Sequence, residues 1–336
     1  MSPLEVAVAI VLHDDAPDVP DCLAAVAAQT GVDFELVVVD CASRDGGPEV
    51  ARRHASPARP TRVLELGENR GFAGGMNAAF AASAAPWMLT LNADARPAPD
   101  YLERLLATAA TCHARGLAVG AATGRLRREG EPPTLDACGM YLAPAWRHLD
   151  RGSSEPDRGQ YDRPARVFGG TGAATLWSRT AIDDVALAPG EMFDPRFHTY
   201  REDAELCFRL RERGWEVIYE PSARAVHRRR VLPERRRNLP ELANANSLRN
   251  RYLLRLYHQT AGNFWRTLPA TLARDLAAFA YVALVERSSL PAYGWLLRHR
   301  RELLARRRAI QARRTRPASE LDDWFRRREA PLPEAR

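Results

Sequence analysis

The chain of 336 residues contains no lysine, so all 49 of its basic residues are arginine. Acidic residues number 42, and the formal net charge is +7 at pH 7. The planar guanidinium group donates hydrogen bonds in a geometry that suits phosphate and carboxylate, so this composition favours anionic partners. Apolar content of 46% and charged content of 27% are typical of a globular protein with one or two domains.

Cysteine is also scarce. The five cysteines are an odd number, lie far apart in the chain and include no Cys-x-x-Cys pair. This pattern excludes a disulfide framework and a structural zinc site, and it indicates a reducing compartment. The residues are Cys22, Cys41, Cys112, Cys138 and Cys207.

Long hydrophobic runs are missing as well. The longest, residues 276–285, is flanked by Asp275 and Glu286 and is too short to span a bilayer. No basic segment precedes the short apolar run near the N-terminus, which argues against a signal peptide. We therefore expect a cytoplasmic protein, either free or peripheral on the inner face of the cell membrane.

Two common phosphate-binding motifs are absent. The segment 71–77 is rich in small residues, which allow a backbone to approach a ligand closely. It lacks the G-x-G-x-x-G spacing of a dinucleotide fingerprint, and the chain has no G-K-[ST] sequence. Neither a Rossmann dehydrogenase nor a P-loop protein is supported.

Strand-like and helix-like segments alternate over the first two thirds of the chain, and this alternation predicts an α/β fold with a mainly parallel sheet. Strands are predicted at 4–12, 34–39, 61–66, 87–92, 117–123, 167–178, 215–220 and 223–227. Helices are predicted at 18–29, 48–54, 71–85, 101–111 and 202–213, the last closed by Gly214.

Three segments depart from this alternation. Residues 125–165 predict a surface insertion or hairpin, and the arginine-rich residues 224–237 predict a mobile loop. Beyond them, apolar residues recur at three and four positions from Trp265 to Phe279, and residues 298–316 are rich in arginine. These helices suit either the anionic surface of a membrane or packing against the first domain, so we predict a catalytic domain at 1–237 and a basic helical region at 238–336.

Carboxylates follow two of the predicted strands. Asp94 lies three residues after the end of the apolar run 87–91, where it would be a hard oxygen ligand for Mg2+ or Mn2+ carrying a phosphate. Asp40 follows Val37–Val39, where it would accept hydrogen bonds from a nucleotide base or ribose. A turn-forming aspartate is the simpler interpretation of each residue on its own.

The ordered set of motifs resembles the family-2 glycosyltransferases with the GT-A fold, and within them the rhamnosyltransferase-like branch. The resemblance covers about residues 4–230. The matching segments are 37–43, 68–77, 91–94, 193–197, 200–207, Gly214-Trp215 and His227.

The resemblance implies a Rossmann-like, mainly parallel sheet flanked by helices, with a C-terminal helical extension. It implies that Asn92-Ala93-Asp94 stands in for an Asp-x-Asp metal site, with Asp94 as ligand and His227 joining the Mg2+ or Mn2+ ion or the diphosphate. It also implies that Asp203 is the catalytic base. The residues expected to contact the nucleotide-sugar are Asp40, Ser43, Arg70, Gly74, Asn77, Asn92 and Glu202.

Physical chemistry agrees with these roles. Transfer of a sugar from a nucleotide builds negative charge on the leaving diphosphate, which a divalent cation stabilises. Inversion at the sugar needs a carboxylate to take the proton of the acceptor hydroxyl, and Asp203 begins a helix whose dipole favours the ionised form.

Three positions depart from the family pattern. Cys41 and His13-Asp14 leave the nucleotide open. Arg201 would shape the acceptor pocket or hold a phosphate of a lipid-linked acceptor.

We therefore predict an inverting, metal-dependent glycosyltransferase of cell-surface polysaccharide synthesis. Its donor would be dTDP-rhamnose or a UDP-sugar, and its acceptor a glycan or polyprenyl-linked glycan. A nucleotidyltransferase is an alternative, but residues 12–17 lack the glycine-rich basic loop that it needs. A non-catalytic nucleic-acid-binding protein is another, but it leaves Asp40, Asp94 and Asp203 unexplained, and we expect no nucleic-acid partner.

Overall fold

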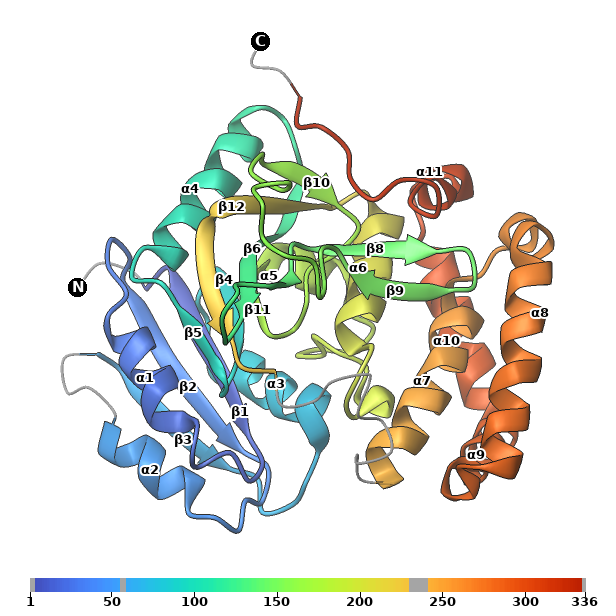
Figure 1. Cartoon of the computed structure of the whole chain (residues 1–336), viewed down its shortest axis with the longest axis horizontal. Helices are drawn as coiled ribbons and strands as arrows, with labels where there is room; N and C mark the ends of the chain where they lie inside the picture. The colour runs from blue at the N-terminus through green and yellow to red at the C-terminus, as the bar shows by residue number, and fades with distance from the viewer. Residues whose placement is uncertain (1–3, 55–58, 230–240, 334–336) are drawn as a thin grey trace.

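A computed structural model describes residues 4–54, 59–229 and 241–333. Its centre is a mixed sheet with helices on both faces (Figure 1). The strand order is β10-β12-β6-β11-β4-β1-β2-β3, with β5 paired to β12 and β7 paired to β6. The strands are β1 (Val6–Leu12), β2 (Phe34–Asp40), β3 (Thr61–Glu65), β4 (Trp87–Asn92), β5 (Ala95–Pro97), β6 (Val119–Arg128), β7 (Leu135–Ala137), β10 (Ala165–Val167), β11 (Ala174–Ser178) and β12 (Glu216–His227).

The first four strands are parallel, as the sequence predicts, whereas β11 runs antiparallel to both β4 and β6. Consecutive side chains of a strand point to opposite faces, and both faces of β1 and β2 are buried. Val37 and Val39 join the core on one face, while Leu36 and Val38 join the core on the other. This two-sided burial explains why the strands read as continuous apolar runs.

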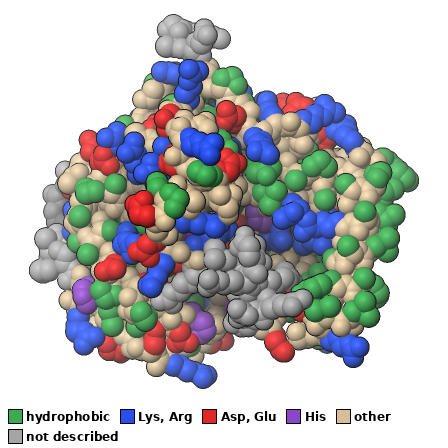
Figure 2. Space-filling view, in the orientation of Figure 1, with side chains coloured by type: hydrophobic (Ala, Val, Ile, Leu, Met, Phe, Trp, Pro, Cys, Tyr) green, Lys and Arg blue, Asp and Glu red, His purple; other side chains and the backbone are tan. Residues whose placement is uncertain are grey.

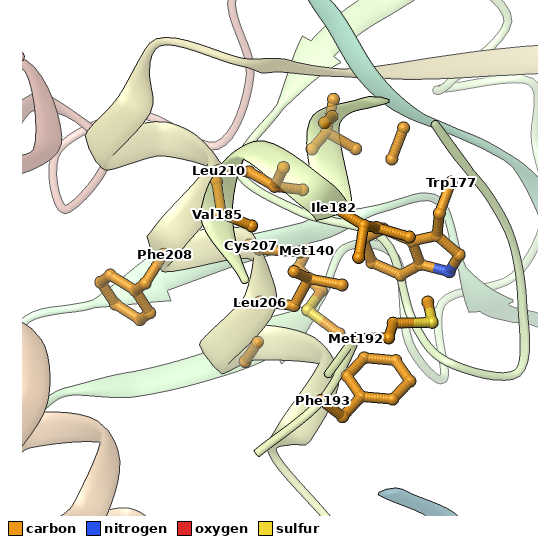
Figure 3. Close-up of a cluster of buried hydrophobic side chains, with 14 of the residues drawn as sticks. Met140, Trp177, Ile182, Val185, Met192, Phe193, Leu206, Cys207, Phe208 and Leu210 are labelled. Carbon is orange, nitrogen blue, oxygen red and sulfur yellow. The ribbon is translucent and has the colours of Figure 1, made fainter. Parts of the chain in front are cut away.

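Helices cover both faces of the sheet. One face is covered by α1 (Val19–Ala27), α2 (Gly47–His54) and α4 (Tyr101–Ala114), and the other by α3 (Gly71–Ala82), α5 (Arg179–Val185) and α6 (Glu202–Arg213). Figure 3 shows Leu206 and Leu210 of α6 packed among Trp177, Ile182 and Phe193. This contact buries the inner face of α6 and fixes where its N-terminus lies.

The predicted hairpin is confirmed: β8 (Met140–Ala143) pairs with β9 (Arg147–Asp150). The expectation that the whole insertion lies at the surface is wrong, because Leu135, Asp136 and Cys138 are buried. Arg151 is buried too, and its guanidinium lies over the rings of Tyr161 and Tyr219. The segment looked like a loop because its buried groups are polar or isolated instead of periodic.

The last sheet strand also differs from prediction. The two strands expected at 215–220 and 223–227 form one strand, β12, with an irregular register between Glu220 and Arg224. Residues 224–227 are therefore strand, not loop. The rest of the predicted loop, residues 230–237, lies outside the described residues.

The C-terminal helices pack against the sheet domain (Figure 1). Buried polar contacts fasten them: His258 Nδ1 lies 3.1 Å from Glu212 Oε1, and Arg306 Nε lies 2.7 Å from Asp194 Oδ2. The helices are α7 (Glu241–His258), α8 (Ala261–Leu284), α9 (Pro291–Arg298), α10 (Arg300–Arg313) and α11 (Ala318–Asp323), with short 3-10 turns at Pro195–Phe197 and Arg287–Ser289.

The apolar stripe predicted on α8 faces outward. Trp265 is 71% exposed, Leu276 62% and Phe279 55%. Among the described residues no single helix is long and apolar enough to cross a membrane, although one bent pair, α8 with 287–298 at 113°, meets the length and composition test.

Candidate functional site

Polar side chains collect where the strands end. Asp40 ends β2 and Asn92 ends β4, and both strands pair with β1, whose Val11 lies opposite Asn92 and whose Leu12 lies opposite Asp40. The carboxyl ends of neighbouring parallel strands form one edge, which is the usual ligand-binding edge of an α/β sheet. We call this the carboxyl edge.

A chain of contacts crosses this edge around His227, the last residue of β12. Nε2 of His227 lies 3.2 Å from Oδ1 of Asp94, and Nδ1 lies 2.7 Å from Oδ2 of Asp136. Burial disfavours the charged ring, but the two carboxylates outweigh it and raise the pKa of His227 to about 9. The free protein therefore holds His227 as an imidazolium between two carboxylates.

Asp136 is held ionised in turn. Burial opposes its charge, yet His227 and Arg229 lower the pKa of Asp136 to about 2. Nη1 of Arg229 lies 2.7 Å from Asp136 Oδ1 and 3.0 Å from Asp150 Oδ2. Asp136 and Asp150 thus tie the insertion to the carboxyl edge.

The edge offers a divalent cation one carboxylate rather than a full protein shell. Among residues 4–54, 59–229 and 241–333 no three His, Cys, Asp or Glu side chains are placed to hold a metal ion. Mg2+ and Mn2+ sites that carry substrate phosphates need only one or two carboxylates, because phosphates and waters fill the other positions. Asp94 fits that role, while His227 is already engaged by Asp136 and Asp94 and would have to lose a proton to join it.

Asp203 lies in the first turn of α6, as predicted. Its Oδ2 accepts a hydrogen bond from the backbone N–H of Gly172 at 2.9 Å, and its Oδ1 accepts one from Ala204 at 2.7 Å. Burial raises the pKa of Asp203, the two hydrogen bonds oppose this, and the result is about 6. A carboxylate with a pKa near the working pH is suited to accept a proton.

Asp203 is connected to the carboxyl edge through two consecutive residues. Gly172 donates to Asp203, and the next carbonyl, that of Ala173, accepts from the N–H of Asn92 at 2.9 Å. Phe72 of the glycine-rich segment packs closely against Gly172, since a Cβ on Gly172 would lie 3.0 Å from the Phe72 ring. The structure therefore brings Asn92, Asp94 and Asp203 to one edge.

Glu202 lies differently from its neighbour. It is buried, and its Oε2 has no hydrogen-bond partner among the described residues. Burial first, and the charge of Asp203 second, raise the pKa of Glu202 well above its usual value. Its predicted contact with the donor stays a prediction.

The expected nucleotide-binding residues are arranged around the ends of β1 and β2. The buried Asp40 carboxylate accepts from the N–H of Ser43 at 3.2 Å. His13 Nδ1 lies 2.8 Å from the carbonyl of Cys41, and Nε2 of the same ring lies 2.9 Å from Asn69 Nδ2. His13 and Cys41, which depart from the family pattern, therefore help to join the chain after β1 to the chain after β2 and to Asn69.

The glycine-rich segment has a structural role that the sequence did not reveal. Gly71 has φ +67°, and a Cβ there would lie 2.3 Å from the carbonyl oxygen of His198. The backbone at Gly71 thus approaches the protein's own chain at His198 closely, and this contact explains the glycine. Asn77 donates to and accepts from the backbone of Phe193 at 2.8 Å, and Arg70 is exposed beside Glu68. Contacts of Arg70, Gly74 and Asn77 with a donor remain predictions.

Sequence reasoning missed Asp136, Asp150, Arg229 and Gly172. Asp136 and His227 are 91 residues apart, and Gly172 and Asp203 are 31 apart. No local periodicity reports such contacts; only the short apolar pieces around Asp136 hinted at buried structure.

Known proteins resemble this chain in sequence. Residues 7–133 match the family model described as glycosyl transferase family 2. Over 245 residues the chain is 26% identical to an N-acetylglucosaminyl-diphospho-decaprenol L-rhamnosyltransferase of Mycobacterium tuberculosis, covering 66% of this chain and 75% of the relative.

Solved structures share the fold. A mannosyltransferase of Pyrobaculum calidifontis in complex with GDP-Man and Mn2+ superposes with TM-score 0.53 at 19% identity, covering 93% of this chain and 86% of its own. TarS 1-349 of S. aureus in complex with UDP-GlcNAc gives TM-score 0.54 at 12% identity, with 96% and 91% covered. At these identities the structures support the GT-A fold alone. Over residues 7–133 the chain is thus similar to glycosyl transferase family 2, and over nearly its whole length it has the fold of these transferases.

Proposed function

We propose that the protein is an inverting, divalent-metal-dependent transferase that moves a sugar from a nucleotide-sugar to a lipid-linked glycan of a cell-surface polysaccharide. The single observation that carries this proposal is the placement of Asp203. It lies at the N-terminus of α6 and is joined through residues 172–173 to the strand end that carries Asn92 and Asp94. A base and a diphosphate site at one edge are what an inverting transfer requires.

The donor would occupy the ends of β1, β2 and β4. Asp40 and Ser43 would contact the nucleotide, and Asp94 would hold Mg2+ or Mn2+ at the diphosphate. When bound, that ion supplies positive charge to the leaving group. His227 keeps Asp94 oriented by donating to it, and Asp136 keeps His227 oriented in the same way.

Asp203 would take the proton of the acceptor hydroxyl. Its position is fixed by Gly172 and by the packing of α6, so little reorganisation is needed when the acceptor binds. The family match favours sugar transfer over the nucleotidyltransferase and nucleic-acid-binding alternatives.

The name of one relative guides the choice of donor and acceptor. The Mycobacterium tuberculosis relative is named for an L-rhamnosyl donor group and for a diphospho-decaprenol acceptor. We therefore propose dTDP-rhamnose first and UDP-sugars second as donors, and a polyprenyl-diphosphate-linked sugar as acceptor. We also propose the division into a catalytic domain at 1–237 and a helical region at 238–336.

A donor panel tests the proposal. The full chain would be incubated with Mn2+ and dTDP-, UDP- and GDP-sugars, with and without a polyprenyl-diphospho-sugar, and release of nucleoside diphosphate would be measured. We expect acceptor-stimulated release from one donor and none in the presence of EDTA. Release from no donor, with nucleotide binding absent by calorimetry, would overturn the proposal.

A further inference from the structure

A group of arginines lies near Asp203, where the β8–β9 hairpin and the start of α6 meet α7. Arg147 begins β9, Arg201 precedes α6, Arg251 lies in α7 and Arg274 lies in α8. We call these four residues the arginine cluster. In Figure 2 arginine side chains gather between the β8–β9 hairpin and α7, to the right of the centre.

Contacts between elements hold the arginine cluster together. Nη1 of Arg201 lies 3.2 Å from Nδ1 of His148, and its Nε lies 3.4 Å from the carbonyl oxygen of Ser247 in α7. Arg251 forms an ion pair with Asp275 of α8, and Asp275 also accepts from Arg255 at 2.7 Å. The hairpin, the start of α6 and helices α7 and α8 therefore meet at this point.

Positive charge exceeds negative charge within the cluster. Within the described part of the chain, no carboxylate lies within ion-pair distance of the Arg201 guanidinium, and its contacts above are to neutral groups. Burial first, then the charges of Arg274, Arg251 and Arg147, lower the pKa of Arg201 to about 9, although the charge of Asp203 opposes this shift. The same surroundings lower the pKa of His148 well below its usual value.

A concentration of fixed, like charges in a poorly solvated place is unfavourable for the free protein. It becomes favourable when a polyanion enters, because guanidinium groups bind phosphate through pairs of hydrogen bonds. Arg201 has φ 74°, a left-handed conformation, and it precedes Asp203 by two residues. An anion on this cluster would therefore lie next to the base.

Under the proposed function both substrates carry a diphosphate, namely the nucleotide-sugar donor and the lipid-linked acceptor. The location of the arginine cluster indicates which of the two it would bind. The donor diphosphate belongs with Asp94 and a divalent cation at the carboxyl edge. The arginine cluster lies toward α7 and α8, the helices that also carry apolar surface. Between α7, α8, α9 and α10 lies a cavity of about 700 Å3 whose lining includes Leu256, Phe264, Leu296 and Leu303.

Resting on the proposed function, we infer that the arginine cluster binds the diphosphate of the lipid-linked acceptor without a metal ion. The diphosphate would place the acceptor sugar against Asp203, and the lipid chain would leave along the apolar surface of α7–α10. Charged hydrogen bonds from several guanidinium groups take the place of a cation at this second site.

Calorimetry with geranyl diphosphate in EDTA tests the inference on the full chain. We expect wild type to bind, geraniol not to bind, and Arg147→Gln and Arg201→Gln each to weaken binding about 10- to 100-fold. Arg147 is exposed, so its substitution should leave folding intact. Arg301→Gln, at an exposed position of α10, is the matched control and should bind as wild type does. Asp94→Asn should also bind as wild type does.

Competition identifies the site. dTDP and UDP in EDTA should not displace geranyl diphosphate from the wild-type protein. Unchanged affinity in both arginine variants, or displacement by the nucleotides, would overturn the inference. Donor turnover is measured separately. If the wild type turns over a donor but both arginine variants bind geranyl diphosphate with unchanged affinity, the proposed function stands and this inference fails. If the wild type binds geranyl diphosphate tightly without metal but turns over no donor, the inference stands and the proposed function fails.

Discussion

The carboxyl edge and the arginine cluster both lie near Asp203, and their electrostatics are opposite. At the edge, negative groups are neutralised within the protein: His227 lies between Asp94 and Asp136, and Arg229 bridges Asp136 and Asp150. In the cluster, the charges of three other guanidinium groups act on Arg201, which contacts the neutral ring of His148. The edge is prepared for a cation and the cluster for an anion, which suits a base that works between two different substrates.

The largest effect is expected from removing the base. Asp203→Asn should lower transfer about 1,000-fold, because proton removal from the acceptor is lost, while donor affinity stays within error. The amide keeps an oxygen for the Gly172 N–H and loses only the bond from the Ala204 N–H, so the fold should persist. Kinetics and nucleotide calorimetry on the same preparation measure this, with Asp323→Asn at an exposed position of α11 as control. Turnover near wild type would remove Asp203 from the mechanism.

The next effect concerns the edge. Asp94→Asn should weaken Mn2+-dependent binding of the donor nucleotide about 100-fold, because the cation loses its carboxylate. Binding of the same nucleotide in EDTA should change little. If the variant retains the full Mn2+ dependence of wild type, the metal lies elsewhere.

A smaller loss is expected from the residue behind His227. Asp136→Asn should weaken Mn2+-dependent nucleotide affinity about 10-fold, because His227 loses the partner that orients it toward Asp94. Metal-free nucleotide binding separates this positioning role from general damage to the fold. Loss of the positioning role leaves metal-free binding unchanged, whereas damage to the fold weakens it. Equal loss in both conditions would contradict the assignment.

The outward face of α8 gives the smallest effect. Replacing Trp265, Leu276 and Phe279 together by serine should reduce recovery with anionic vesicles on flotation, by about 10-fold in partition, because apolar area no longer enters the interface. Leu242→Ser, at another exposed apolar position, is the control. Point substitutions suit this test better than truncation, since His258 and Arg306 fasten the helices to buried carboxylates. Equal recovery of variant and wild type would remove the membrane proposal.

Local patterns predicted much of this molecule and failed where contacts are distant. Strands β1, β2 and β4 and helix α6 follow from apolar runs, helical spacing and Gly214, which ends α6 at φ +92°. The positions of Asp40 and Asn92 at strand ends, and of Asp203 in the first turn of α6, follow from those elements.

The partners of these residues do not follow from local patterns. Asp136 sits in a segment without periodicity, and the arginine cluster is assembled from four separate elements. The outward face of α8 is a further example, since spacing reveals a stripe but not what covers it.

The pH dependence of kcat/KM tests the central claim most directly. Asp203 accepts a proton only when ionised, and its pKa is raised to about 6, so the active form is lost as pH falls through that value. We predict that kcat/KM falls about tenfold per pH unit below 6 and is level above it, and that the residual rate of Asp203→Asn lacks this inflection. A wild-type profile that stays level through pH 6, or an inflection that persists in Asp203→Asn, would contradict the account.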